Sequence, residues 1–298
     1  MKLLILVNPR AGNGAGDALG RMLNTHGEVQ HISFETLTEQ LTAAEGFDCL
    51  LVAGGDGTIS SVLSSPALPP IPVAPIPLGT ANDLAREFGV LRALKGASWN
   101  EIPTLIESWS SRPLTIWEVA VDGRSIPLTN YCSLGYEGYV VADFHRWRAR
   151  NPSTRRMFNR VMYGWFGLLN AAKRAKDLAL TCDSLEAETV PCMSLIVSNI
   201  RSYLGLGTSN NIGSASDLKL ECVATSSILD YLRILLATSS ILKPPRLLCS
   251  GSCIEVQSIP PGMPLQIDGE PRDVVYGGTI RFTPSKTVQI WAPSLTPS

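Results

Sequence analysis

The segment Cys49–Ser60, CLLVAGGDGTIS, constrains the fold more than any other part of the chain. It opens with an apolar run of the length expected for a strand that is buried on both faces, as in a parallel sheet. The run ends at the glycine turn Gly54–Thr58, and the residues after it suit an amphipathic helix. This order is typical of phosphate-binding turns, because glycines let backbone N–H groups approach an anion and the helix N-terminus adds partial positive charge.

Asp56 is the unusual residue of this turn. A carboxylate that points at a phosphate repels it unless a metal ion or a water molecule lies between them, so Asp56 indicates Mg²⁺. The alternative is a tight turn in which Asp serves turn chemistry alone.

The first part of the chain alternates apolar runs with helix-like segments. Such alternation predicts a doubly wound α/β domain with a parallel sheet, in which ligands lie beyond the carboxyl ends of the strands. The loops at Asn8, Thr36 and Gly54 all fall at that edge, so they can converge on one ligand. The predicted strands are Lys2–Val7, Val29–Phe34 and Cys49–Ala53, and the predicted helices are Asp17–His26 and Thr38–Glu45.

The loop Asn8–Gly16, NPRAGNGAG, is a weaker signal. Gly12 and Gly14 fit the first two glycines of G-x-G-x-x-G, but Asp17 stands at the third position, and no Gly-Lys-Ser/Thr of a P-loop follows. The loop is therefore either a plain turn or a contact for phosphate through its N–H groups and Arg10.

A second glycine turn follows the proline-rich stretch Pro69–Pro77, in which Val73–Ile76 is predicted to be a strand at a sheet edge. The turn reads GTANDLAR from Gly79. One interpretation is purely structural, with Thr80 as a helix N-cap and Asp83 as its partner in a capping box. Because this leaves Gly79 and Asn82 unexplained, the alternative is a second helix N-terminus with N–H donors for an anion.

The character of the sequence changes near Arg112. Short β-favouring runs, separated by Gly, Pro, Ser and Asp, predict an antiparallel β-rich, β-sandwich-like second domain. The predicted domains are residues 1–112, with 284–298 returning to the first domain through Thr287–Ala292, and residues 113–283. The β-favouring runs are Leu114–Val121, Ser125–Leu134, Cys192–Ser198, Leu218–Ala224, Ser252–Ser258, Leu265–Asp268 and Thr279–Thr283.

Composition narrows the class of protein further. A chain of 298 residues can hold two domains. Its seven cysteines lack metal-ligand spacing, and its beginning lacks the pattern of a signal peptide, so we expect reduced thiols and a cytoplasmic protein. The apolar stretch Ile228–Leu242 contains Asp230 and Arg233, which argues against a membrane span.

A basic helical insertion is predicted at about residues 146–176. This segment has nine Lys and Arg residues, no acidic residue, and the aromatic and apolar centre Val161–Leu169. A helix of this kind resembles a membrane-surface element, so we expect peripheral contact with an anionic membrane. The alternative is a helix that packs on the sheet and leaves its arginines solvated. We expect no nucleic-acid partner, because the net charge of the chain is −1.

Five motifs in order give the chain a resemblance to the bacterial diacylglycerol kinase-like lipid kinases. Their wider superfamily includes sphingosine and ceramide kinases and, more distantly, NAD kinases and phosphofructokinases. The second glycine turn is the motif that separates the lipid kinases from the NAD kinases. The motifs are Asn8-Pro9 with its glycine loop, Gly54–Thr58, Gly79–Arg86, Asn130–Gly135 and Asp268–Pro271.

The resemblance implies two domains with ATP in a cleft, and two catalytic residues, Asp56 and Glu270. Glu270 would accept the proton of the lipid hydroxyl, because a carboxylate within hydrogen-bond reach orients the attacking group in phosphoryl transfer. Asp56 and Asp83 would hold catalytic Mg²⁺. The implied ATP contacts are Asn8, Thr36, Gly54, Gly55, Asp56, Gly57, Thr58, Ile59, Ser60, Gly79, Thr80 and Asn82.

The resemblance also implies a structural Mg²⁺ site, from which this sequence departs. The usual Asp-Gly-x-Leu strand entry has Leu218 in place of the glycine, so Asp217 would bind the ion with carbonyls of Ser214 and Lys219. One carboxylate and a few neutral oxygens make a weak site for Mg²⁺.

A diacylglycerol-like alcohol is the expected acceptor, with ATP and Mg²⁺ as cofactors. Two alternatives stay open at this point: a small-molecule kinase of the NAD kinase or polyol kinase type, and a catalytically impaired protein that binds nucleotide or lipid. The sequence leaves the oligomeric state open, with a homodimer as one option.

Overall fold

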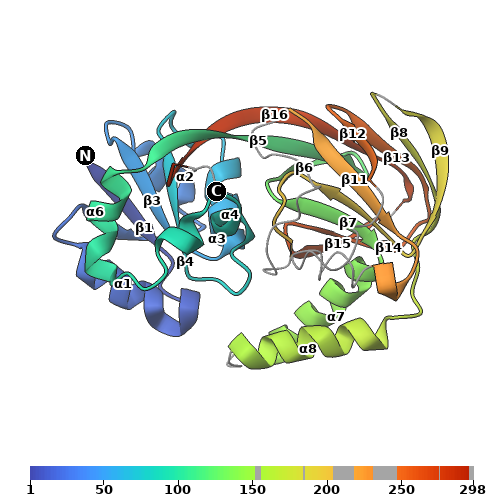
Figure 1. Cartoon of the computed structure of the whole chain (residues 1–298), viewed down its shortest axis with the longest axis horizontal. Helices are drawn as coiled ribbons and strands as arrows, with labels where there is room; N and C mark the ends of the chain where they lie inside the picture. Colours follow the sequence, from blue (N-terminus) through green and yellow to red (C-terminus); the bar gives the residue numbers. More distant parts are fainter. Residues whose placement is uncertain (152–155, 184, 204–217, 231–246, 275, 295–298) are drawn as a thin grey trace. The chain divides into compact units, whose positions relative to one another are not determined.

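The computed structural model describes residues 1–151, 156–183, 185–203, 218–230, 247–274 and 276–294 (Figure 1). The chain divides into two compact units. The first comprises Met1–Ile116 and Lys286–Ser298, and the second comprises Trp117–Ser285.

The first unit is built on a parallel sheet. Its strands lie in the order β2 (Glu28–His31), β1 (Leu3–Val7), β3 (Cys49–Gly54) and β4 (Val73–Pro77), and each pair of neighbours is parallel. All residues of β1 and β3 are buried, as the apolar runs of the sequence predict for strands covered on both faces. The predicted α/β fold is thereby confirmed for this unit.

Helices connect these strands. The longest are α1 (Ala15–Leu23) and α3 (Asp56–Ser64), which follow β1 and β3. The shorter helices are α2 (Leu37–Thr42), α4 (Asp83–Glu87), α5 (Val90–Ala93) and α6 (Ile102–Glu107), with 3-10 turns at Ala11–Gly14 and Trp99–Glu101.

The predicted edge position of Val73–Ile76 is wrong. Strand β4 pairs with β3 along five residues and also meets β16 (Gly278–Ala292), through Val73 and Ile290. Pro75 has no N–H to donate, so proline limits this strand's hydrogen bonding without excluding it from the sheet interior.

The second unit is antiparallel and β-rich, as predicted. Its six-stranded sheet has the order β12-β11-β10-β7-β14-β15, and every neighbouring pair in it is antiparallel. The strands are β12 (Leu247–Gly251), β11 (Leu220–Thr225), β10 (Ser194–Ser198), β7 (Tyr131–Gly135), β14 (Met263–Ile267) and β15 (Glu270–Val274).

Further strands of this unit pack on the six-stranded sheet through a shared core. That core joins Leu195 and Leu265 of the sheet with Val256 and Phe282 of β13 and β16. The further strands are β6 (Arg124–Leu128), β8 (Lys176–Cys182), β9 (Leu185–Cys192), β13 (Ile254–Ile259) and the first part of β16.

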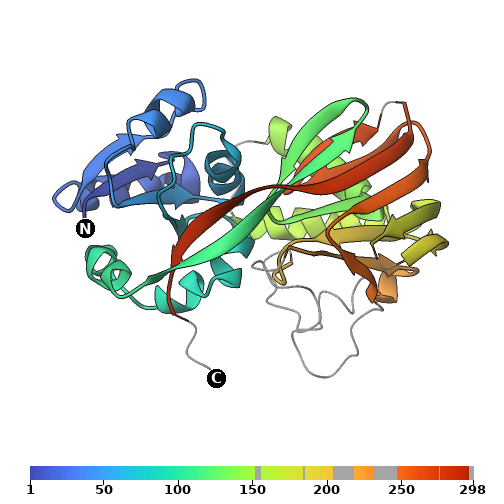
Figure 2. The same cartoon turned by 90° about the horizontal axis from the view of Figure 1, so that it is seen from above.

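Two long strands carry the chain between the units. Strand β5 (Ser110–Val121) leaves the first unit after Ile116, and β16 returns to it at Lys286. The two strands pair with each other, and Figure 2 shows them side by side in green and red. The predicted runs Thr279–Thr283 and Thr287–Ala292 are therefore parts of one strand.

The basic helical insertion differs from the prediction in its limits. Two helices form, α7 (Tyr136–Arg150) and α8 (Arg156–Leu169), and β8 begins already at Lys176. Helix α7 begins ten residues before the basic segment because its first turns, with Tyr136, Val140 and Val141 buried, pack on the sheet. Charge marks only the exposed end of this helix, so it gave the wrong start.

Two other predictions concern the character of the chain. All seven cysteines are free, as expected for reduced thiols. Among the described residues, no helix combines the length and the apolar character that crossing a bilayer requires. Most of the stretch Ile228–Leu242 lies outside the described residues.

Candidate active site

Two glycine turns meet at the carboxyl edge of the parallel sheet. One follows β3 and the other follows β4, and these strands are neighbours. A Cβ atom on Gly79 would lie 2.6 Å from Cα of Gly55, a separation that real Cβ atoms do not show. The two backbones can approach this closely only because both residues are glycine.

Asp56 joins the two turns by a hydrogen bond. It is the first residue of α3, and its Oδ1 accepts the N–H of Leu84 at 3.2 Å. Burial raises the pKa of Asp56 above its usual range, and N–H groups of Leu84, Asn82 and Asp83 act in the opposite direction. The donors that the sequence offered to an anion at the second turn therefore face the carboxylate of Asp56.

Asn82 shapes the second turn. Its backbone is left-handed (φ 54°), its Oδ1 accepts the N–H of Gly79 at 2.8 Å, and its Nδ2 donates to the carbonyl of Gly79 at 2.9 Å. Asn82 is also the N-cap residue of α4, so the capping box proposed for Thr80 and Asp83 is wrong. Asn tolerates the left-handed conformation better than most residues, which explains its presence at this position.

The first loop also reaches this edge. Nδ2 of Asn8 donates to Oγ1 of Thr58 at 2.9 Å, and Oδ1 of Asn8 accepts the N–H of Arg10 at 3.1 Å. Gly12, with φ of +62°, lies so close to the second turn that a Cβ would be 3.3 Å from the carbonyl of Leu78. Three loops of the first unit are thus in contact.

The remaining predicted ATP contacts differ in accessibility. Thr36, which precedes α2, and Thr80 are exposed, whereas Ile59 and Ser60 are buried within α3. The N–H of Ile59 donates to the carbonyl of Gly55 at 3.1 Å. A Cβ on Gly57 would meet no atom within 4 Å, so the first turn of α3 borders open space at this residue.

Glu270 is held on a tight hairpin in the second unit. Strands β14 and β15 pair through Ile267 and Glu270, which leaves Asp268 and Gly269 as a two-residue loop, both with positive φ. Asp-Gly is a pair of residues that favours such two-residue hairpin turns.

Asp268 anchors this hairpin to the beginning of β7. Its carboxylate accepts N–H groups of Thr129 (2.8 Å), Asn130 (2.7 Å) and Tyr131 (3.2 Å), and the hydroxyl of Thr129 at 2.6 Å. Burial raises the pKa of Asp268, and these four donors act in the opposite direction. The N–H of Gly269 donates to Gln266, which fixes the loop from its other side.

His145 of α7 is the ionisable group beside Glu270. Its Nδ1 lies 3.8 Å from Oε2 of Glu270, and the two side chains are 30% and 54% exposed. Burial, the largest influence, lowers the pKa of His145, while the charge of Glu270 raises it.

The predicted metal residues are only partly described. Asp83 is 2% exposed and follows Asn82 directly, so it lies beside the N–H groups that face Asp56. Lys219 is exposed and precedes β11, whereas Ser214 and Asp217 lie outside the described residues. Among the described residues no cluster of three or more His, Cys, Asp or Glu side chains could hold a metal ion.

Sequence reasoning missed two residues of these sites. Asp268 belongs to one of the five sequence motifs, but the sequence did not predict its role of accepting four hydrogen bonds that hold the hairpin of Glu270 in place. His145 carried no signal, because its partner is 125 positions away in the sequence and belongs to a strand that was not predicted.

The fold combines a parallel α/β sheet, with glycine turns at its carboxyl edge, and an antiparallel β-rich unit. Two family models match the chain, one mainly in each unit. The diacylglycerol kinase catalytic domain matches residues 2–109, and the diacylglycerol kinase accessory domain matches residues 127–271. The two matches together cover well over half of the chain, and the chain belongs to the diacylglycerol kinase family.

Individual relatives agree with this assignment. The chain is 26% identical to diacylglycerol kinase 1 of Arabidopsis thaliana and 27% identical to human diacylglycerol kinase theta, each over 90% of its length. It spans 42% and 32% of those two proteins. A crystal structure of a diacylglycerol kinase from Bacillus anthracis shares the fold with a TM-score of 0.63 and 17% identity, covering 99% of this chain and 98% of the other.

The contact of the two turns predicts the effect of Gly79→Ala. The new Cβ would lie 2.6 Å from Cα of Gly55 and 2.8 Å from Oδ1 of Asn82, so the backbone must move. We expect the free energy of unfolding to fall by about 1–3 kcal/mol, measured by chemical denaturation. The control is Gly164→Ala in α8, where a Cβ meets no atom within 4 Å; it should be neutral or stabilising by up to about 1 kcal/mol. Equal stability of Gly79→Ala and the wild type would contradict the close approach.

Proposed function

We propose that the protein is an ATP- and Mg²⁺-dependent lipid kinase that transfers the γ-phosphate to a hydroxyl of a diacylglycerol-like lipid. Family membership supports the reaction class, and the names of the relatives support the acceptor. The observation that carries the proposal is the backbone contact between the two glycine turns, with Asp56 bonded across it.

The nucleotide phosphates would lie at the first turn of α3. This helix has nine residues, and its first N–H groups have no partner within the helix itself. Open space beside Gly57 leaves room for an anion at this point. Thr36 and Thr80, both exposed, are available for further contacts with the nucleotide.

Asp56 and Asp83 suit a magnesium ion that also binds phosphate. Mg²⁺ commonly takes one or two carboxylates and completes its shell with water and phosphate oxygens, so Asp56 alone, or Asp56 together with Asp83, would be sufficient. The ion would neutralise charge that develops on the transferred phosphoryl group. The structural Mg²⁺ site at Asp217 stays a prediction, because two of its three residues lie outside the described ranges.

Glu270 would accept the proton of the attacking hydroxyl. In phosphoryl transfer the protein mainly positions the groups and neutralises charge, and a carboxylate near the acceptor orients it. The hairpin fixed by Asp268 gives Glu270 a defined position, and its 54% exposed side chain is accessible to a substrate.

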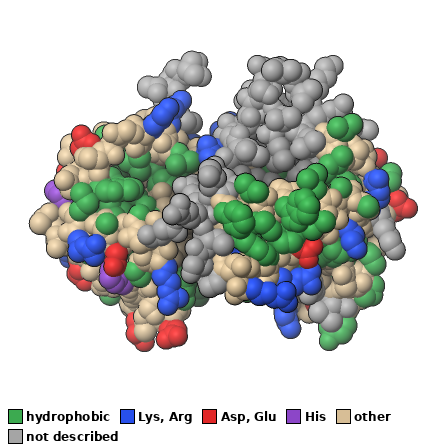
Figure 3. All heavy atoms as spheres, turned by 90° about the horizontal axis from the view of Figure 1, so that it is seen from below, with side chains coloured by type: hydrophobic (Ala, Val, Ile, Leu, Met, Phe, Trp, Pro, Cys, Tyr) green, Lys and Arg blue, Asp and Glu red, His purple; other side chains and the backbone are tan. Residues whose placement is uncertain are grey.

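Helix α8 would hold the protein at the membrane that contains its substrate. Figure 3 shows hydrophobic side chains gathered beside Lys and Arg side chains on the face where α8 lies. Five apolar side chains of this helix are each more than half exposed: Phe158, Val161, Trp165, Leu168 and Leu169. Their spacing of three and four residues puts most of them on one stripe.

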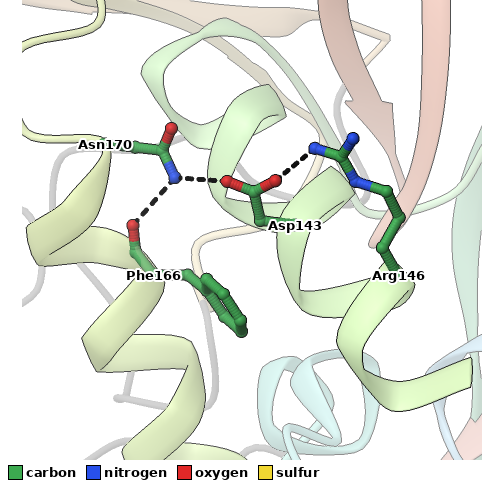
Figure 4. A network of polar contacts seen from close by, with 4 residues as sticks. All are labelled: Asp143, Arg146, Phe166 and Asn170. Atoms are coloured by element: carbon green, nitrogen blue, oxygen red, sulfur yellow. Dashed lines mark hydrogen bonds and ion pairs between the residues drawn. The ribbon is translucent and has the colours of Figure 1, made fainter. Parts of the chain in front are cut away.

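The opposite side of α8 is fixed to α7. Nδ2 of Asn170 donates to Asp143 at 2.8 Å and to the carbonyl of Phe166 at 3.0 Å, and Asp143 also pairs with Arg146 (Figure 4). The hydroxyl of Tyr136 donates to the carbonyl of Gly167 at 3.0 Å. The stripe therefore faces outward because the other side of the helix is already occupied.

Basic residues near the stripe favour an anionic lipid surface. Arg146, Arg148, Arg150, Lys173 and Arg174 are exposed, and each would contribute at most about 1 kcal/mol near such a surface. We therefore propose a reversible, peripheral association that combines insertion of the apolar stripe with attraction by these charges.

The identity of the acceptor is tested with γ-labelled ATP. A total lipid extract and a panel of soluble alcohols, NAD included, are incubated with the protein, and the labelled product is identified. Label in a diacylglycerol-derived product supports the proposal. Label in a soluble product alone, or nucleotide binding with no transfer to any lipid, would reject it.

Substitution of Asp56 tests the metal role. We expect Asp56→Ala to abolish transfer while the protein still folds, and Asp56→Asn, which keeps an acceptor for the N–H of Leu84, to lose at least about 100-fold in turnover. Initial rates at saturating Mg²⁺ measure the effect, and circular dichroism checks the fold. The exposed carboxylate Glu45, changed to Gln, is the control. Wild-type turnover by either Asp56 variant would remove this residue from the metal role.

Substitution of Glu270 tests the proton acceptor. We expect Glu270→Gln to lower kcat by roughly 10²–10⁴-fold with little change in ATP affinity, because the amide cannot take the proton of the hydroxyl. Steady-state kinetics and nucleotide titration separate the two effects. Glu188→Gln, at an exposed position of β9, should behave like the wild type. A decrease of less than about threefold in the Glu270 variant would exclude general-base catalysis by this residue.

The double variant Trp165→Ser and Leu168→Ser tests the docking stripe. Burying a large apolar side chain contributes about 1.5–3 kcal/mol, so we expect at least a tenfold loss of vesicle binding in flotation. Tyr276→Ser, which removes an exposed aromatic ring elsewhere, is the control. Undiminished flotation of the double variant would refute insertion, and equal binding of the wild type to neutral and anionic vesicles would refute the electrostatic part.

A further inference from the structure

The pair of His145 and Glu270 joins two elements that are held rigidly against each other. Helix α7 carries His145, and β15 begins with Glu270. A Cβ on Gly138 of α7 would lie 2.4 Å from the carbonyl oxygen of Pro264, so the backbone of the helix lies directly against the backbone of β14. On the other side, Asp268 holds the hairpin through its four donors. The fold therefore fixes the two backbone segments from which ring and carboxylate approach each other to 3.8 Å.

We propose that His145 is a positioning residue for Glu270, and that its ring, carried by α7, limits where this carboxylate lies during phosphoryl transfer. The inference rests on the proposed role of Glu270 as proton acceptor. In each turnover the hydroxyl oxygen would form a bond to the γ-phosphorus of ATP while the bond from that phosphorus to the β–γ bridging oxygen breaks, so that ADP leaves. The hydroxyl proton would pass to a carboxylate oxygen of Glu270, which would release it to water afterwards.

The charges around the ring determine when this arrangement works. Burial lowers the pKa of His145, the carboxylate of Glu270 raises it, and Arg148 lowers it again. A hydrogen bond with the backbone of Gly269 also raises the pKa of His145, and the charge of Arg272 of β15 lowers it. The net direction is downward, so the ring is neutral at neutral pH. Under those conditions the ring of His145 therefore adds no positive charge beside Glu270.

Protonation of His145 would place a positive charge beside Glu270. An imidazolium 3.8 Å from Oε2 would form an ion pair with Glu270, and a nearby positive charge favours the ionised form of a carboxylate. Glu270 would then be a weaker base for the hydroxyl proton. We therefore expect acid to inactivate the enzyme in part through His145.

Two substitutions separate positioning from packing. In His145→Phe the ring is kept but its polar atoms are lost, and we expect kcat to fall by about 10–100-fold, the range for a misplaced catalytic group, with KM for ATP unchanged. In His145→Gln a polar group remains that does not titrate. We expect a smaller loss of kcat and an acid limb of the kcat–pH profile displaced to lower pH.

The control is a histidine–carboxylate pair in the first unit. Nε2 of His31 lies 3.3 Å from Oδ1 of Asp17, and both side chains are exposed. His31→Gln should leave both the plateau of kcat and the acid limb unchanged. A change in the acid limb of this control equal to that of His145→Gln would mean that the effect is not specific to Glu270.

A second measurement does not depend on activity. The ring resonances of His145 are titrated by NMR in the wild type and in Glu270→Gln. Because the carboxylate raises the pKa of His145, we expect the titration midpoint to fall when the carboxylate is removed. An unchanged midpoint would overturn the proposed pairing, even if the phenylalanine variant failed to fold.

The outcomes also distinguish this inference from the proposed function. If the wild type transfers phosphate to no lipid, or Glu270→Gln keeps full activity, the proposed function fails. If Glu270→Gln is inactive but His145→Gln and His145→Phe match the wild type in kcat and in pH profile, only the role of His145 fails.

Discussion

The near contact of Gly55 and Gly79 is the constraint on which the first unit's site depends. The two residues come from separate crossovers of one parallel sheet, and a single added carbon on either side would separate them. Once the turns touch, Asp56 can reach the N–H of Leu84, and Asn82 can close its own turn on Gly79. The absence of side chains on Gly55 and Gly79 thus allows the two turns to approach, and the polar contacts depend on that approach. This order explains why a carboxylate can stand in a turn that otherwise offers amide donors to an anion.

The second unit also contains a buried carboxylate that joins two backbone segments. There, too, a buried carboxylate accepts several backbone N–H groups and joins two segments that are distant in sequence, since Asp268 holds residues 129–131. In both places the charge is stabilised by oriented amides, which compensate part of the cost of burial. Asp56 and Asp268 therefore act first as connectors of the backbone. Each of them stands beside an accessible group. Open space borders Gly57, which follows Asp56, and the side chain of Glu270, near Asp268, is exposed.

Much of this could be predicted from sequence where a local pattern reports a local structure. The apolar run of β3, the glycine turn after it and the Asp-Gly hairpin are all of this kind. Prediction failed where the decisive contact was distant. Thr80 has the right chemistry for an N-cap, but Asn82 is the N-cap of α4, and the close approach of Gly79 to Gly55 is a tertiary contact that no local pattern reports. Likewise Ser125–Leu134 read as one run, although β6 pairs with β5 while β7 pairs with β10 and β14. His145 could not be found at all, because only tertiary structure brings it to Glu270.

The two long strands β5 and β16 make the second unit an insertion within the first. Both junctions fall inside a strand, after Ile116 and before Lys286, and not in a linker. No single cut of the polypeptide yields the first unit intact, because its sheet includes Ile290 of β16, which follows the inserted second unit in the sequence. During translation β4 therefore lacks its pairing with β16 until the whole inserted portion has emerged from the ribosome. Loss of the segment around Ile290 would accordingly leave β4 without this partner, although β4 and its other partner, β3, lie far earlier in the sequence.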